Sequence, residues 1–209
     1  MDKNIKIRFN LDKNSEYEDV WQKMRDFTEA RHADTQDEIW VLQHTPVFTL
    51  GLAGKREHIL NTSHNIPIIH CDRGGQVTYH APGQLVIYTL IDLKRLGISI
   101  RELVERLEKA IIQYLAIQNI HAVNNKDAPG VYVDGGKIAS LGLKVRKNCT
   151  YHGLSFNVNM DLTPFNHINV CGYSNLKVVN LNSYINVTSI DDVAHDLLPI
   201  ITNALLNQL

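Results

Sequence analysis

The sequence predicts an α+β fold in which helices pack against a mixed or antiparallel β-sheet. Several short segments show the alternation, or the β-branched and apolar composition, that is typical of strands. Other segments carry apolar residues at helical spacing behind capping residues. The helical segments interrupt the strands irregularly, which favours α+β over a regular parallel α/β fold. We expect one domain over residues 1–209, because no repeat, low-complexity tract or linker divides the chain.

Three helices are predicted from caps and apolar spacing. A Ser–x–x–Glu pattern, in which each side chain caps the other residue's backbone, begins at Ser15 and again at Ser99. Apolar residues follow both serines at helical spacing, so residues 16–31 and the segment after Ser99 are expected to form amphipathic helices. Ser189 is expected to cap a last helix, which Pro199 should kink.

The strands are predicted between these helices, with one before the first. Gly135-Gly136 is expected to form the two-residue turn of a β-hairpin, since both positions of such a turn favour positive φ angles. The segment 150–158 should pair beside that hairpin. The predicted strands span residues 5–9, 39–43, 47–50, 66–71, 84–93, 131–134, 137–145 and 150–158.

Charge and cysteine content exclude several classes of protein. The formal net charge of −1 gives no reason to expect nucleic acid or a membrane surface as a partner, and no apolar run approaches a membrane span. The first residues do not resemble a secretory signal, so we expect a cytoplasmic protein. The three cysteines, Cys71, Cys149 and Cys171, are an odd number in an expected reducing compartment, which argues against a disulfide framework. They form no CxxC pair, which argues against a structural zinc site. We expect a packed thiol at Cys71 and an exposed one at Cys149.

The segment from Arg73 to Gln84 has the composition of a ligand-binding loop. Two glycines follow the arginine and allow close approach of the backbone to a ligand, and a Pro-Gly pair makes a second turn. The spacing matches neither a P-loop nor a GxGxxG motif, so a nucleotide site is not supported. The candidate substrate-binding residues are Arg73, Gly74, Gly75, Gln76, Val77, Thr78, Tyr79 and His80.

Lys137 and Cys171 are the candidate catalytic residues. A lysine after a hairpin turn is usually solvated, but Lys137 is followed by small and apolar residues that could draw it into a pocket. Cys171 lies in a non-periodic segment with Gly172 directly after it, where backbone N–H groups can face an oxyanion. A nearby ammonium lowers the pKa of a thiol, so the pair predicts a nucleophile that carries an acyl group.

Two other groups of residues leave alternatives open. His80 or His152 could pair with Cys171 as a cysteine–histidine couple. The basic residues Lys144, Arg146 and Lys147, and also Lys55 and Arg56, are either solvated surface or a landing site for an acidic protein partner.

With these motifs the chain resembles the lipoyl/octanoyl transferases of the biotin/lipoate protein ligase superfamily over nearly its whole length. The resemblance is carried by four segments in order: 73–84, 136–142, 151–158 and 161–172. It implies an α/β sandwich around a mixed sheet, similar to the catalytic domain of biotin and lipoate protein ligases.

The resemblance also implies a reaction that requires neither a cofactor nor a metal. Cys171 would take an octanoyl or lipoyl group from acyl carrier protein, and Lys137 would lower the pKa of its thiol and act as acid and base. The acceptors would be lysines of lipoyl domains in 2-oxoacid dehydrogenases and of the glycine cleavage H protein. Ser140, Leu141, Gly142, Gly153, Leu154 and Ser155 would join the Arg73–His80 segment around the acyl chain.

Three other functions fit part of the pattern. An ATP-dependent lipoate or biotin ligase would share the fold, but it would not need Cys171, and the adenylate loop typical of biotin ligases is absent from the sequence. A non-catalytic module that binds lipoyl domains or carrier protein would keep the surface without the Lys137–Cys171 pair. A cysteine hydrolase that uses His80 or His152 would release the acyl group to water.

Overall fold

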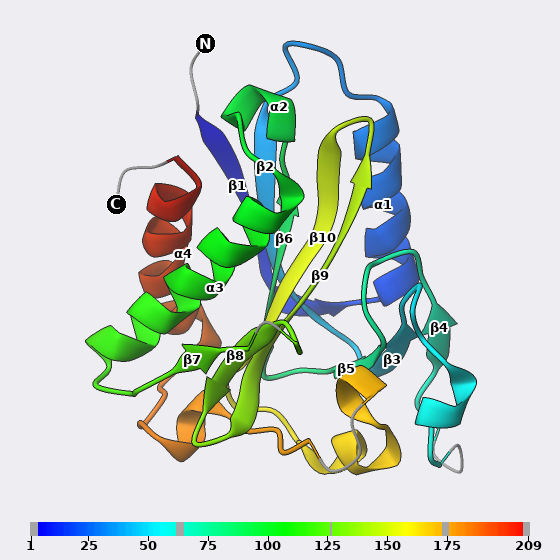
Figure 1. Ribbon diagram of the computed structural model, residues 1–209, viewed down its shortest axis with the longest axis vertical. Helices are drawn as coiled ribbons and strands as arrows, with labels where there is room; N and C mark the ends of the chain where they lie inside the picture. Colours follow the sequence, from blue (N-terminus) through cyan, green and yellow to red (C-terminus); the bar gives the residue numbers. More distant parts are fainter. Residues whose placement is uncertain (1–3, 62–64, 126, 173–175, 207–209) are drawn as a thin grey trace.

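The structure, a computed structural model, describes residues 4–61, 65–125, 127–172 and 176–206 of the chain, without the side chains of Asp12, Lys13 and Cys171. It consists of a large mixed sheet with helices on both faces and a small second sheet beside it (Figure 1). The predicted α+β architecture is therefore confirmed.

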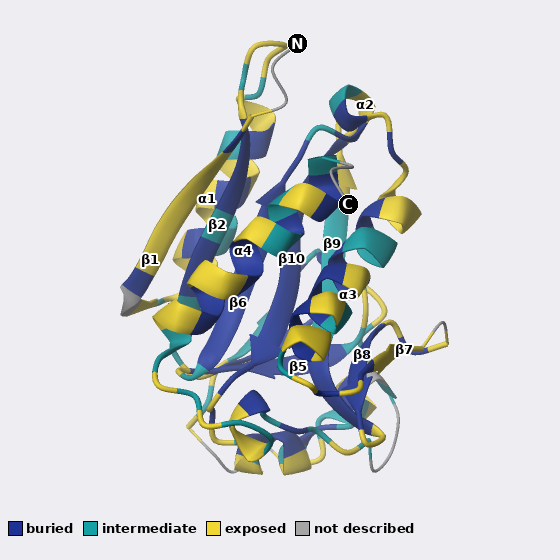
Figure 2. Ribbon diagram, turned by 90° about the vertical axis from the view of Figure 1, so that its left-hand side faces the viewer, coloured by how far each residue is buried: buried dark blue, intermediate teal, exposed yellow. Residues whose placement is uncertain are grey.

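The large sheet has seven strands in the order β1-β2-β6-β10-β9-β8-β7. Only β1 and β2 are paired in parallel, and all other neighbours are antiparallel. Figure 2 shows the central strands buried and β1 exposed at the edge. The strands are β1 (Ile5–Ser15), β2 (Asp37–His44), β6 (Gln84–Leu90), β7 (Val123–Asn124), β8 (Gly130–Val133), β9 (Gly136–Arg146) and β10 (Cys149–Asn157).

The small sheet has the order β4-β3-β5, with strands β3 (Val47–Leu50), β4 (Ile68–His70) and β5 (Val77–His80). The strand β5 falls inside the segment that was predicted to be a ligand-binding loop. Phe48 of β3 and Tyr79 of β5 pack with Phe165 into a separate apolar cluster. One face of the small sheet is thereby fixed, and the other turns toward the large sheet.

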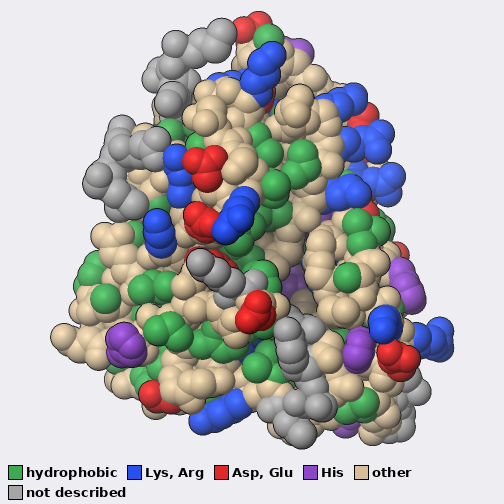
Figure 3. Space-filling view, in the orientation of Figure 1, with side chains coloured by type: hydrophobic (Ala, Val, Ile, Leu, Met, Phe, Trp, Pro, Cys, Tyr) green, Lys and Arg blue, Asp and Glu red, His purple; other side chains and the backbone are tan. Residues whose placement is uncertain are grey.

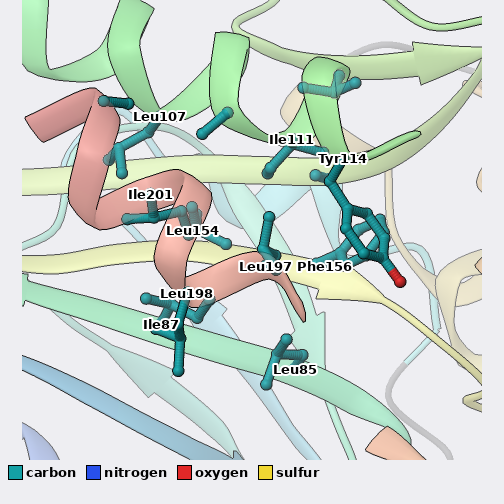
Figure 4. Packing of buried hydrophobic residues seen from close by; sticks show 14 of the residues in the cluster. Leu85, Ile87, Leu107, Ile111, Tyr114, Leu154, Phe156, Leu197, Leu198 and Ile201 are labelled. Atoms are coloured by element: carbon teal, nitrogen blue, oxygen red, sulfur yellow. The ribbon is translucent and has the colours of Figure 1, made fainter. Parts of the chain in front are cut away.

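Helices α3 (Ile100–Ile117) and α4 (Ile190–Leu206) cover one face of the large sheet, and α1 (Tyr17–Glu29) covers the other. In Figure 4, Leu107 and Ile111 of α3 meet Leu197 and Ile201 of α4 over β10. These residues are at most 1% exposed, so this face is closed by apolar packing and leaves the α1 face for a site.

Most element predictions hold, and the differences have local causes. Ser99 and Glu102 form the expected capping box, but Ser15 is the last residue of β1, so no box opens α1. The hairpin turn is Asp134-Gly135, with φ of 49° and 72°, and Gly136 already pairs in β9. A short helix that was not expected from the sequence, α2 (Leu93–Leu96), begins at the last residue of the predicted strand 84–93.

Candidate active site

A narrow pocket lies between the α1 face of the large sheet and the small sheet. It has a volume of about 50 Å³, and its surface is mostly apolar. Figure 3 shows a narrow hollow near the middle of the view, with histidine visible inside it. The lining residues are Tyr17, Arg73, Gly75, Gln76, Val77, Thr78, His80, Val86, Tyr88, Ser140, Leu141, Gly142, His152, Gly153, Leu154 and Ser155.

Glycines keep the floor of this pocket flat. Gly142 of β9 pairs with Gly153 of β10. A Cβ at Gly153 would lie 2.1 Å from the carbonyl oxygen of Ile87, and one at Gly142 would lie 3.0 Å from that of Gly74. The contact at Gly142 shows that the sheet and the Arg73 loop approach each other closely, and the contact at Gly153 shows that β10 leaves no room for a side chain beside β6.

Arg73 fixes the loop that forms one wall. Its guanidinium donates to the carbonyl of Thr49 at 2.6 Å, to that of Gln76 at 2.8 Å and to that of Gly74 at 2.9 Å. Arg73 is only 8% exposed. Its role here is to satisfy buried carbonyls and to hold the glycine loop against β3.

Three histidines and two tyrosines form a packed aromatic group at one end of the pocket. The rings of Tyr17 and His80 are stacked with centroids 5.9 Å apart, and those of Tyr17 and His152 with centroids 6.4 Å apart. His44 Nε2 lies 2.7 Å from the hydroxyl of Tyr88. Burial lowers the pKa of His44 to about 4 and lowers that of His80 well below its ordinary value. Burial also lowers the pKa of His152. The group is therefore uncharged at neutral pH.

Asp72 connects the aromatic group to α1 and β10. Its carboxylate accepts hydrogen bonds from Trp21 Nε1 at 2.8 Å, from His152 Nε2 at 3.0 Å and from the hydroxyl of Tyr151. Burial raises the pKa of Asp72, but these hydrogen bonds, led by that from His152, more than offset it and hold the pKa well below its ordinary value. A charged acceptor thus holds three elements together.

Lys137 is buried, as predicted, but it is not among the residues that line the pocket. It is 1% exposed, its ammonium donates to the carbonyl of Pro129 at 2.9 Å, and it lies 5.4 Å from the centre of the Tyr132 ring. A Cβ at Gly130 would lie 2.5 Å from Lys137 Cε, so only glycine leaves room for the lysine side chain there.

Backbone hydrogen bonds hold the described residues on both sides of Cys171. Asn169 donates its backbone N–H to the carbonyl of His58 at 2.8 Å, and Val179 donates to the carbonyl of Lys137 at 3.0 Å. A Cβ at Gly172 would lie 3.5 Å from Cδ of Gln76, which lines the pocket. The side chain of Cys171 lies outside the described part of the structure, so its distance to Lys137 stays a prediction.

The structure gathers most of the predicted substrate-binding residues around one pocket. Gly74 stays behind its wall, where its N–H bonds to the carbonyl of Leu143 at 2.9 Å. Tyr79 points the other way and packs against Phe48 and Phe165. Tyr17, Val86 and Tyr88 line the pocket but were not predicted to, because Tyr17 belongs to a stripe of apolar residues on a helix and the other two lie in an apolar strand.

Two predictions outside the pocket have different outcomes. Cys149 is 5% exposed rather than exposed, because Asn148 beside it accepts a hydrogen bond from Leu93 at the start of α2. Arg146 and Lys147 both form ion pairs with Glu29 on α1. Figure 3 shows Lys and Arg side chains gathered on this side of the molecule, and a role for them in partner binding stays a prediction.

Comparison with known proteins places this fold and pocket in a family. The family model of the lipoyl protein ligase A/B catalytic domain matches residues 16–201. The chain belongs to this family. Among curated relatives of this lipoyl protein ligase A/B domain, the Octanoyltransferase of Chromobacterium violaceum is 57% identical over 185 residues, covering 88% of both chains. The Octanoyltransferase of Haemophilus influenzae (strain PittEE) is 53% identical over 177 residues, covering 84% of this chain and 83% of that protein.

Solved structures support the same fold. A lipoate-protein ligase A bound with ATP superimposes with a TM-score of 0.72 at 15% identity, covering 98% of this chain and 86% of that one. The predicted likeness to lipoate ligases is therefore confirmed for the fold. Within the described residues, no helix is long and apolar enough to cross a membrane.

Proposed function

We propose that this lipoyl protein ligase A/B family member is an octanoyltransferase that forms an octanoyl thioester on Cys171. The observation that supports this most is the narrow, mostly apolar pocket. Beside it, the backbone of the buried Lys137 is hydrogen-bonded to Lys177 and Val179, which follow Cys171 in the chain. The names of relatives that are 53–57% identical support the same acyl group. The acceptors are lipoyl-domain lysines and the donor is octanoyl acyl carrier protein.

The reaction has two steps. The Cys171 thiolate attacks the thioester carbonyl, an S–C bond forms, and the thiol of the donor leaves with a proton. The amine of the acceptor lysine then attacks the new thioester, loses a proton, and releases the Cys171 thiolate as the amide forms. Because the first step exchanges one thioester for another, it needs positioning and an ionised thiol rather than an activating nucleotide.

Lys137 is suited to hold and move the proton in both steps. It is enclosed by Gly130, Pro129 and Tyr132. Little water therefore reaches its ammonium to weaken the attraction between the ammonium and a thiolate. In the first step it donates a proton to the leaving thiol, and in the second it accepts one from the attacking amine.

The pocket suits an acyl chain and its carbonyl. Its flat floor and apolar walls exclude water from the chain. At the side near the Cys171 segment, Gln76 Oε1 and Thr78 Oγ1 are buried polar atoms with no hydrogen-bond partner among the described residues. Thr78 has a hydroxyl proton that a bound carbonyl can accept.

An ATP-dependent ligase is the main alternative, since the fold is shared with a ligase that binds ATP. The two functions differ in their need for Cys171 and in their acyl donor. A carboxylic acid must be activated by a nucleotide, whereas a thioester donor carries its activation with it.

The test is to incubate the protein with octanoyl acyl carrier protein and no nucleotide, and to measure its intact mass and its Cys171 peptide. We expect one octanoyl adduct on Cys171, which disappears when a lipoyl domain is added and is transferred to the lysine of that domain. Lys137→Ala should slow adduct formation by about 10²- to 10⁴-fold, the usual contribution of a general acid or base.

Cys149→Ser is the matched control, because it removes a buried thiol that does not line the pocket. It should keep the adduct, and Cys171→Ser should abolish it. Transfer by Cys171→Ser from free octanoate and ATP would instead establish the ligase, and adduct loss to water without an acceptor would establish the hydrolase.

A further inference from the structure

We propose that Tyr17 closes the far end of the pocket and limits the acyl chain to octanoyl length. This inference rests on the function proposed above, because it assumes that the pocket holds an acyl chain. It assigns a specificity-determining role to a residue that contacts the chain's terminal methyl group and takes no part in the bond changes.

The pocket has a direction, which follows from the sheet order. The Lys137 amine lies against Gly130 of β8, at one side of the pocket. Gly130 pairs with Ser140, Ser140 pairs with Ser155, and Ser155 pairs with Val86 of β6. Tyr88, two residues along β6 from Val86, lines the same pocket as Tyr17. Tyr17 packs against His44 of β2, the strand next to β6 on the side away from β8, so the amine and Tyr17 are at opposite ends.

The part of this path from β9 to β6 matches the length of an octanoyl group. Three spacings between neighbouring strands, at about 4.8 Å each, separate Gly130 from Val86 by roughly 14 Å. An extended chain of eight carbons with bonds of about 1.5 Å covers roughly 9 Å. A carbonyl held over β9, one spacing in from the Lys137 amine, therefore places the terminal methyl group at β6, where Val86 and the aromatic group of Tyr17 lie.

Tyr17 is held too firmly to move aside for a longer chain. It is 1% exposed and its ring is nearly parallel to those of His80 and His152, at 12° and 13°. His44 tilts against the same ring, with centroids 5.1 Å apart, and its own nitrogens contact the carbonyl of Ser15 and the hydroxyl of Tyr88.

The histidines behind Tyr17 have no freedom to rotate either. His80 Nδ1 lies 2.7 Å from Gln84 Oε1, and His152 Nε2 lies 3.0 Å from Asp72. The imidazoles are uncharged because burial lowers the pKa of each, so the wall can lie against a methyl group without a charge to solvate. A rigid, uncharged wall at the closed end of the pocket sets the length of chain that fits.

The experiment compares octanoyl, decanoyl and dodecanoyl acyl carrier protein as donors, with the rate of adduct formation on Cys171 as readout. The wild type should react fastest with the octanoyl donor. In Tyr17→Ala the ratio of decanoyl to octanoyl rates should rise about 15-fold, the effect of burying two further methylene groups. Tyr17→Leu, which keeps an apolar side chain at the start of α1, should show the same direction and is the variant to use if Tyr17→Ala does not fold.

Met24→Ala is the matched control, because Met24 is a fully buried residue of the same helix that does not line the pocket. It should lower stability and leave the ratio unchanged. A wild type that accepts dodecanoyl as fast as octanoyl, or a folded Tyr17 variant with an unchanged ratio, overturns the inference. A wild type that forms no adduct with any donor overturns the proposed function instead.

Discussion

Replacing Asp72 by alanine should destabilise the fold by about 3 kcal/mol. Asp72 accepts hydrogen bonds from Trp21, Tyr151 and His152, and its side chain is 26% exposed. A hydrogen bond to a charged group contributes about 1.5–3 kcal/mol. Three such bonds sum to at least about 4.5 kcal/mol. Because the carboxylate is partly solvated, water replaces some of what is lost, and we expect about 3 kcal/mol. The three donors would remain without this acceptor, one of them on α1 and two on β10.

The assay is urea unfolding followed by far-UV circular dichroism, in which the midpoint should fall while the slope stays constant. At about 2–4 °C per kcal/mol for a protein of this size, the melting temperature should fall by roughly 6–12 °C. Asp34→Ala, at an exposed turn, makes the same charge change and should have little effect.

The pH dependence gives a second check on Asp72. Its folded-state pKa lies below that of the unfolded chain, near 3.9, so its stabilisation is complete above that pH and is lost as the pH falls toward the folded-state value. The difference between wild type and Asp72→Ala should therefore be constant from about pH 5 to 7 and shrink below about pH 4. A difference under about 1 kcal/mol at pH 7 would refute the assignment of these hydrogen bonds.

Three further predictions concern stability. Burial lowers the folded-state pKa of His44 to about 4, against about 6.5 unfolded, so its stabilisation is complete above pH 6.5 and falls with pH. In urea titrations, the free energy of unfolding of the wild type should fall between pH 7 and pH 5 by ~2 kcal/mol more than that of His44→Gln. An equal loss in both proteins would contradict this. Gly153→Ala, whose Cβ would lie 2.1 Å from the Ile87 oxygen, should cost about 3 kcal/mol in thermal unfolding, against about 1–2 for Gly97→Ala, which has a positive φ but open space. Ser99→Ala should cost about 1 kcal/mol by loss of the observed cap, and an unchanged melting temperature would exclude that.

The sequence predicted the walls of the site better than its ends. Residues such as Gly142 and Gly153 lie in compact motifs whose small side chains and turns are visible along the chain. Tyr17 and Tyr88 reach the same pocket only because β6 pairs with β10 and α1 crosses them. No local spacing distinguishes such residues from ordinary core, since apolar periodicity reports burial and not which cavity a side chain faces.

Other differences arose where pairing between strands decided between two conformations that the local sequence favours equally. Ser15 and Glu18 fit a capping box, but pairing of β1 with β2 continues to Ser15 and leaves it extended. Gly135 and Gly136 both tolerate positive φ, and the turn formed one residue earlier because Asp134 accepts a φ of 49°. The hairpin itself was predicted correctly, because the flanking strands fix it more strongly than the turn residues do.

The order of strands in the large sheet also determines when the pocket can exist during synthesis. The end wall at Tyr17 is synthesised first. The strand β10, which carries Gly153 and lies between β6 and β9, is the last strand to leave the ribosome. Until then β6 lacks its β10 partner and presents an unpaired edge to the solvent. Such late, distant pairing is slow, so a nascent chain stalled before Asn157 should be a better chaperone client than the finished protein.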